Sequence, residues 1–164
     1  MRVELTASEI RAAVKAALAE DLGGGDVTTL ATVPRALTFK AVMRAREPLV
    51  VAGLDFARAA FLRLSSAVKV EYRVHDGTHV GRGENLLRIC GSARAILTAE
   101  RVALNFVQRL SGIATLTAQF VAAIPLGRWG KVEDIGHLAV YLCSEEAGFI
   151  TGTDIVIDGG WTAR

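Results

Sequence analysis

The residues whose types and spacing could do chemistry lie on one predicted helix, residues 93–110. Five polar side chains fall on a stripe of this helix about 80° wide: Arg94, Thr98, Arg101, Asn105 and Gln108. Arginine presents a planar fork of donors, so this set could hold a carboxylate or another anion. The same pattern is also typical of a helix face that simply meets water, so periodicity alone leaves both interpretations open.

Glu100 lies next to this stripe, but it projects among the apolar residues of the same helix. An unpaired buried carboxylate costs on the order of several kcal/mol. Because Arg101 points elsewhere on the helix, we expect the partner of Glu100 to come from another element or another subunit.

Two further features, a glycine-rich segment and the two cysteines, do not indicate a binding or catalytic site. Residues 23–29 are rich in glycine, but they lack the Gly-Lys-Ser/Thr ending of a phosphate-binding loop and follow a helix instead of a strand. A helix terminator followed by an Asp/Thr turn explains them better. Cys90 and Cys143 form neither a disulfide framework nor a zinc motif. We therefore assign no catalytic, cofactor-binding or metal-binding residue to this chain.

Capping signals and periodicity predict the elements that position the stripe. Thr6 and Glu9 match a capping box, and Gly23 follows the last residue of an apolar stripe, which predicts a helix over residues 7–22. Ser111-Gly112 is expected to break the helix that carries the polar stripe. The other predicted elements are strands near 37–46, 49–52, 68–74 and 85–90, a helix after Gly53, and a further helix over 113–123.

Composition and charge limit the class of protein. Of the 164 residues, 51% are hydrophobic, and the mean hydropathy is +0.35, which supports a packed core. No apolar run reaches the ~18 residues of a membrane span and no signal peptide is read, so a cytoplasmic location is expected. The net charge of +2 is too small to indicate a nucleic-acid surface. Residues 1–123 hold 16 Lys and Arg against 11 Asp and Glu, whereas residues 124–164 hold 3 against 6.

An ordered series of short motifs spans about three quarters of the chain. It comprises Glu20-Asp21-Leu22, Gly25-Asp26-Val27-Thr28-Thr29, Ala45-Arg46-Glu47-Pro48, Val51-Ala52-Gly53-Leu54, Asp76-Gly77 through Gly83-Glu84, Ala99-Glu100-Arg101-Val102-Ala103-Leu104-Asn105-Phe106, and Ser111-Gly112-Ile113-Ala114-Thr115. In this order the motifs resemble the N-terminal domain of quinolinate phosphoribosyltransferase, also called nicotinate-nucleotide pyrophosphorylase (carboxylating).

This resemblance implies a role for one residue of the polar stripe. In the family, the arginine of a Glu-Arg-x-Ala-Leu-Asn segment binds a quinolinate carboxylate across the dimer interface, which implies that role for Arg101 and a homodimer. Arg94, Asn105 and Gln108 are secondary candidates for substrate binding. The family joins phosphoribosyl pyrophosphate to quinolinate, with loss of carbon dioxide, to make nicotinate mononucleotide in NAD biosynthesis. Most of its catalytic groups, and its Mg²⁺, belong to a C-terminal α/β barrel that this sequence lacks.

The last part of the chain resembles a different family. Ile124-Pro125-Leu126-Gly127-Arg128, Glu133-Asp134-Ile135 and the segment 151–160 are similar to the C-terminal tail of short-chain dehydrogenases/reductases. The tail implies a helix that buries Ile135, Leu138, Ala139 and Leu142, and a strand over Thr153–Asp158. The family's glycine-rich cofactor loop and Tyr-x-x-x-Lys pair are absent, because Tyr141 is followed four residues later by Glu145. We therefore expect no NAD(P) binding.

These observations predict an α+β fold: a small barrel-like or sandwich sheet flanked by helices (residues 1–123), followed by a helix–strand appendage (residues 124–164). We interpret the chain as a chimera whose first part is a truncated quinolinate phosphoribosyltransferase. That family consists of glycosyltransferases of pyridine nucleotide biosynthesis. We expect the chimeric chain to be inactive alone. Two alternatives stay open. The chain could be an NAD(P)-dependent short-chain dehydrogenase/reductase fragment, or a non-enzymatic oligomerisation module that pairs with a full-length transferase.

Overall fold

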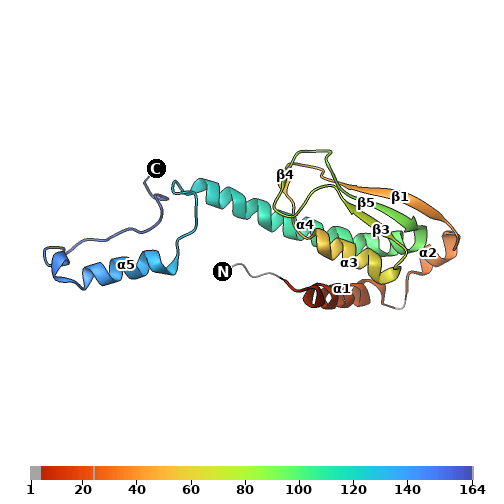
Figure 1. The fold of residues 1–164 in the computed structure, drawn as a ribbon, viewed down its shortest axis with the longest axis horizontal. Coiled ribbons are helices and arrows are strands. Elements are labelled where there is room, and N and C mark those ends of the chain that lie inside the picture. Colours follow the sequence, from red (N-terminus) through yellow and green to blue (C-terminus); the bar gives the residue numbers. More distant parts are fainter. Residues whose placement is uncertain (1–4, 24, 164) are drawn as a thin grey trace. The chain divides into compact units, whose positions relative to one another are not determined.

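The computed structural model describes residues 5–23 and 25–163, and it contains two compact units whose boundary falls within one helix (Figure 1). The first unit ends at Thr115 and the second begins at Leu116. The boundary predicted from the sequence, between residues 123 and 124, lies further along the chain. The two positions differ because the structural boundary is defined by how residues pack, whereas the predicted boundary is defined by a change of sequence motif.

The N-terminal helix α1 spans Ala7–Leu22 and has the predicted capping box. The Thr6 hydroxyl accepts a hydrogen bond from Glu9 N at 3.3 Å, and the Glu9 carboxylate accepts one from Thr6 N at 2.7 Å. Gly23 ends the helix with a φ of +45°.

The segment after Gly23 differs from the turn that we expected. It forms a short helix, α2 (Val27–Thr32), whose N-cap is Asp26. The Asp26 carboxylate accepts a hydrogen bond from Thr29 N at 3.0 Å. The prediction stopped at a turn because the same Asx hydrogen bond begins both a turn and a helix.

The strands form two small open sheets. In the first, β1 (Thr38–Arg44), β5 (Asn85–Ser92) and β3 (Lys69–Tyr72) pair antiparallel in the order β1-β5-β3. In the second, β2 (Leu49–Val50) pairs with β4 (His79–Val80). The mixture of helices with small antiparallel sheets confirms the predicted α+β class. The predicted barrel-like closure is not seen, because the two sheets of the described residues stay open.

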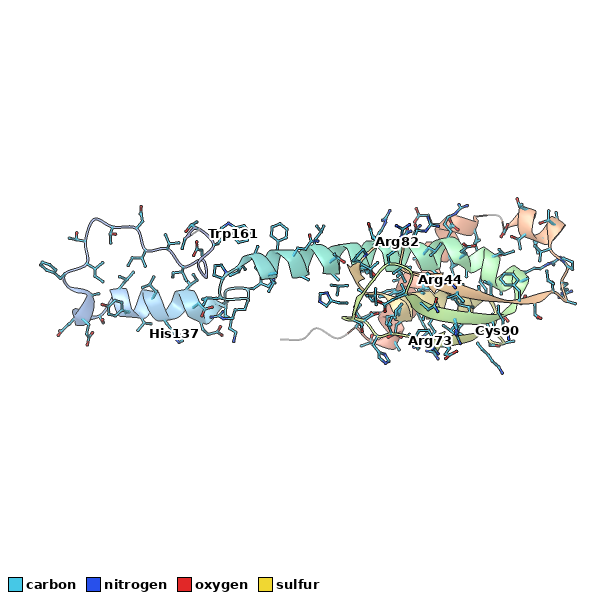
Figure 2. All side chains as sticks on the ribbon, turned by 90° about the horizontal axis from the view of Figure 1, so that it is seen from above. Arg44, Arg73, Arg82, Cys90, His137 and Trp161 are labelled. Atoms are coloured by element: carbon cyan, nitrogen blue, oxygen red, sulfur yellow. The ribbon has the colours of Figure 1, made fainter. Side chains whose placement is uncertain are left out.

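Alternation along the strands gives the larger sheet an apolar and a polar face. Along β1, Met43 is buried, whereas Lys40 and Arg44 are exposed. Cys90 of β5 is exposed between Lys40 and Lys69 in the register, and Figure 2 shows Arg44, Arg73 and Cys90 around this sheet. One face therefore meets water while the other covers the core.

Helices α3 (Leu54–Leu64) and α4 (Ala93–Ala123) contribute most of the helical residues in the core, to which α1 adds Val14 and Leu18. Helix α3 buries Leu54 and Phe61, and α4 buries a row of mostly small residues from Ala93 to Ser111. Gly53, at φ +94°, begins α3 directly against α4: a Cβ there would lie 2.8 Å from Leu110 Cδ1. A side chain at residue 53 would therefore require Leu110 to move, would crowd Phe106 O at 3.3 Å, and would strain the backbone at this φ.

Helix α4 is continuous where a break at Ser111-Gly112 was predicted. The Ser111 hydroxyl accepts a hydrogen bond from Ala52 N at 3.0 Å and donates one to Ala52 O at 3.2 Å. The prediction was wrong because this serine bonds to a distant backbone segment and does not compete with the hydrogen bonds of its own helix.

The second unit contains α5 (Val132–Leu142), the one-turn helix η1 (Glu145–Ala147) and an irregular C-terminal segment. No residue of α5 is buried, and the strand predicted over Thr153–Asp158 is not formed. Ile135 and Leu142, which were expected to face inward, are exposed. Both expectations fail for one reason: a strand needs a neighbouring strand and an apolar helix face needs a sheet, and neither is present among the unit's described residues.

Two of the exclusions made from the sequence can be compared with the described residues. Within residues 5–23 and 25–163, no helix is both long and apolar enough to span a membrane. Cys90 and Cys143 are free thiols, and both are exposed.

Candidate functional site

The first part of the polar stripe of α4 faces α2 and the end of α1. Its first residue, Arg94, has a structural role. Arg94 Nε donates a hydrogen bond to Val33 O at 2.8 Å, and its terminal nitrogen donates one to Leu30 O at 3.0 Å. These acceptors lie at the C-terminal end of α2, where carbonyl groups lack helical partners. Arg94 therefore anchors α2, and these two hydrogen bonds fix the orientation of its guanidinium.

Thr98, one turn later, is also used within the fold. Its hydroxyl donates a hydrogen bond to Asp26 at 2.9 Å, on the carboxylate that caps α2. Hydrogen bonds from Thr29, and then the one from Thr98, hold the pKa of Asp26 below its usual range, and the nearby Arg101 charge acts in the same direction. Thr98 and Asp26 thus attach the start of α2 to α4.

Arg101 is the residue of the stripe whose guanidinium is most available. Its side chain is 76% exposed and contacts Asp21, at the end of α1, in a single ion pair of 3.3 Å. A pair of this length and exposure contributes little to stability and exchanges readily with water. The guanidinium can therefore turn toward an incoming carboxylate while α4 holds its backbone in place.

Asn105 and Gln108 continue the exposed part of the stripe toward the C-terminal end of α4. Neither side chain is hydrogen-bonded to another described residue. The structure thus divides the predicted stripe in two: Arg94 and Thr98 hold α2, whereas Arg101, Asn105 and Gln108 point outward.

The expected burial of Glu100 among apolar residues is not seen within this chain, while a partner from another subunit stays a prediction. Glu100 is exposed, and it forms no ion pair with a described residue. Its neighbour Leu97 is itself partly exposed, so this edge of α4 meets water and a carboxylate there needs no buried partner.

Three polar residues with a structural role were missed by sequence reasoning. The Asp76 carboxylate accepts hydrogen bonds from Gly53 N at 2.8 Å and Leu54 N at 3.2 Å, so it caps α3 from a distant turn. Ser111 and Thr115 bind the backbone of Ala52 and Val50, respectively. Their short motifs were noted, but their partners lie 22 to 65 residues away, so no local signal could reveal the contacts.

No donor set for a metal ion comes together in the part of the chain that the structure describes, since no group of three or more His, Cys, Asp and Glu side chains is found. The ligands that a Mg²⁺ ion would need are therefore not found together among these residues.

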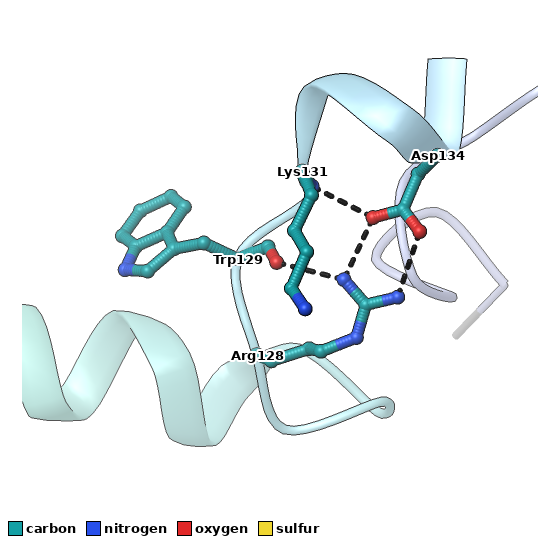
Figure 3. Close-up of polar contacts among 4 residues, drawn as sticks. All are labelled: Arg128, Trp129, Lys131 and Asp134. Atoms are coloured by element: carbon teal, nitrogen blue, oxygen red, sulfur yellow. Dashed lines mark hydrogen bonds and ion pairs between the residues drawn. The ribbon is translucent and has the colours of Figure 1, made fainter. Parts of the chain in front are cut away.

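A polar cluster lies at the start of α5 in the second unit, and Figure 3 shows it. Arg128 makes a two-pronged contact with Asp134, at 2.7 and 2.9 Å, and donates to Trp129 O at 3.0 Å. The Asp134 carboxylate also accepts a hydrogen bond from Lys131 N at 2.7 Å. The Arg128 guanidinium, followed by this backbone bond, holds the pKa of Asp134 well below its usual range. The cluster caps the start of α5.

The N-terminal part of the chain matches a known family. Residues 26–111 match the family model "Quinolinate phosphoribosyl transferase, N-terminal domain". A nicotinate-nucleotide pyrophosphorylase (carboxylating) of Mycobacterium leprae is 42% identical over 127 residues, which are 76% of this chain and 44% of that protein. A chloroplastic protein of the same name from Oryza sativa is 44% identical over 110 residues, which are 66% of this chain and 30% of that protein. The chain therefore spans less than half the length of these relatives.

Solved structures agree with the sequence relatives. The nicotinate-nucleotide pyrophosphorylase of Francisella tularensis matches with a TM-score of 0.69 and 31% identity, over 74% of this chain and 43% of that one. NadC from Streptococcus pyogenes matches with a TM-score of 0.71 and 38% identity, over 75% and 44% of the two chains.

The C-terminal part of the chain matches a second family model. Residues 97–162 match "Enoyl-(Acyl carrier protein) reductase", which agrees with the predicted dehydrogenase-like tail. The match begins within α4 and overlaps the end of the first match, so the two similarities share residues 97–111.

Proposed function

The chain belongs to the quinolinate phosphoribosyl transferase N-terminal domain family, and from this premise we propose that its first unit supplies Arg101 to the active site of a second chain. In this proposal the Arg101 guanidinium binds a carboxylate of quinolinate, while the second chain contributes the barrel that holds phosphoribosyl pyrophosphate. The single observation that carries the proposal is the state of Arg101: exposed, on a rigid helix, and held by one long ion pair.

The neighbouring residues support this assignment. Arg94 is committed to two carbonyl groups of α2, so it is a positioning residue that fixes α2 against α4. Asn105 and Gln108 extend the exposed face and would contact the second chain or the substrate. The resemblance implies that a homodimer brings the two parts together. In this proposal the partner is a full-length transferase, because the described residues of this chain form two small open sheets and no α/β barrel.

A complementation assay tests the proposal. A full-length relative is prepared with alanine in place of the arginine of its Glu-Arg-x-Ala-Leu-Asn segment, and this chain is added in excess. Release of nicotinate mononucleotide should rise on the order of tenfold or more, because a two-pronged arginine–carboxylate contact is restored. The Arg101→Ala chain should not restore activity, whereas the Arg88→Ala chain, changed at an exposed arginine of the sheet, should.

The assay also separates the proposal from its alternatives. Mixed dimers without restored activity would indicate a non-enzymatic oligomerisation module, and the absence of mixed dimers would refute the proposal. Turnover of quinolinate by this chain alone would show that the missing barrel groups are not needed, and it would also refute the proposal.

A further inference from the structure

A groove between α1 and α3 lies apart from the residues discussed above. The two helices pack side by side in the first unit (Figure 1). Between them is a cavity of about 790 Å³, within the usual range for small-molecule sites. No residue of the α4 stripe lines it, so it does not rest on the proposed function.

The floor of the groove is apolar. Ile10 and Val14 come from α1, and Ala59 and Leu62 come from α3. Val14 is buried, and the other three are partly buried, so they offer apolar surface that is still open to a ligand. Such a floor favours an aliphatic chain or an aromatic ring.

The rim of the groove is strongly basic. Four cations line it, Arg11 and Lys15 from α1 and Arg58 and Arg63 from α3, whereas Asp55 is the one carboxylate in the lining. Asp55 accepts a hydrogen bond from Tyr72, beside Arg58. Arg11, Lys15 and Arg63 form no ion pair with any residue in 5–23 or 25–163. The rim thus has an excess of three positive charges that the described part of the chain leaves unneutralised.

We propose that this groove binds an amphiphilic anion, an aliphatic or aromatic group that carries a carboxylate, sulfonate or phosphate. The apolar part lies on the floor, and the anionic group lies among the cations of the rim. Two simpler classes of ligand fit less well. A neutral apolar molecule would form no ion pair with the cations of the rim. A small hydrophilic anion would leave the apolar floor of the groove exposed to water.

The test uses two probes that share one ring system. The anionic probe is 1-anilinonaphthalene-8-sulfonate, and the neutral probe is N-phenyl-1-naphthylamine; both gain fluorescence in apolar sites. We expect the sulfonate to bind saturably and at least about tenfold more tightly than the amine. Raising the salt from about 0.05 M to about 0.5 M should weaken the sulfonate alone, because exposed charges are screened.

A matched pair of variants places the binding in the groove. Ala12 and Ala16 are both exposed alanines of α1, but only Ala12 lines the groove. Ala12→Phe should obstruct part of the groove and weaken the saturable phase, whereas Ala16→Phe should leave it unchanged. Circular dichroism checks that both variants keep their helices.

A second set of variants tests the charges without filling the cavity. Arg11→Gln and Lys15→Gln should each weaken sulfonate binding about two- to fivefold, whereas Lys40→Gln, on the outer face of the sheet, should not. Dodecanoate and dodecyl phosphate should displace the probe, and dodecanol should not; the stronger competitor identifies the anionic group. Equal affinity for the two probes, or binding that is insensitive to both Ala12→Phe and Arg11→Gln, would overturn the proposal.

Discussion

Replacing Ser111 by alanine tests whether the hydroxyl group that crosses from α4 to the β2–α3 connection stabilises the first unit. Ser111 is 1% exposed, and its hydroxyl serves both the N–H and the C=O of Ala52. Alanine is a better helix former by roughly 0.5 kcal/mol, so helix propensity works against the expected loss. Each backbone group left without a partner costs about 1–3 kcal/mol. We expect the free energy of unfolding to fall by about 2 kcal/mol.

The assay must report on the first unit. Both tryptophans, Trp129 and Trp161, lie in the second unit, so tryptophan fluorescence would follow the wrong part of the chain. Urea unfolding followed by far-ultraviolet circular dichroism is suitable, because most of the described helix lies in α1, α3 and α4. The midpoint should fall while the slope stays constant.

Two further variants sharpen the result. Ser66→Ala, at an exposed serine, should change the free energy of unfolding by less than about 0.5 kcal/mol. Thr115→Val removes the acceptor for Val50 N, 2.9 Å away, and should cost about 1 kcal/mol. If Ser111→Ala behaves like Ser66→Ala, water satisfies Ala52, and the reasoning about this contact is refuted.

Three other outcomes are expected. Titration with NAD(H) or NADP(H) should give no saturable change in cofactor fluorescence, since the tail lacks the phosphate-binding turn of a dinucleotide fold; micromolar binding would contradict this. Amide hydrogen exchange should be fast across residues 126–164 and slow across residues 93–110, and equal protection would mean one cooperative domain. Burial, followed by the hydrogen bond to Asp55, raises the pKa of Tyr72 to about 12. Because the folded pKa lies above the unfolded value of 10, this contribution to stability is present below pH 10 and is lost as the pH rises through about 12. Absorbance at about 295 nm should therefore show a late tyrosinate step that Tyr72→Phe removes and Tyr141→Phe retains.

Local signals predicted the parts of the fold that local interactions determine. The capping box of Thr6 and Glu9 lies within one helical turn, so the sequence alone revealed it. The alternation before Asp76 placed β3, and Gly53 preceded the predicted helix α3. In each case the sequence signal lies within a few neighbouring residues, although β3 pairs with β5 and Asp76 caps α3.

Roles that depend on distant partners could not be predicted. Periodicity put Arg94 and Arg101 on one face of a helix, but it could not show that Arg94 bonds to Leu30 and Val33 while Arg101 stays exposed. The same limit explains Ser111, which looked like a helix breaker because its partner, Ala52, is 59 residues away. The tail strand failed for the opposite reason: its sequence pattern persists although the strand it should pair with is absent from the described chain.

The exposed apolar residues of the second unit have a consequence for the lifetime of the chain in a cell. Phe149 is 100% exposed, and Val132, Val140 and Val156 are also largely exposed. Chaperones and proteases bind such segments. Degradation that starts in a loosely packed segment can proceed before the more stable unit unfolds. We therefore expect the abundance of this chain to depend on its least compact part, so that trimming the second unit prolongs its half-life more than any change that stabilises the first.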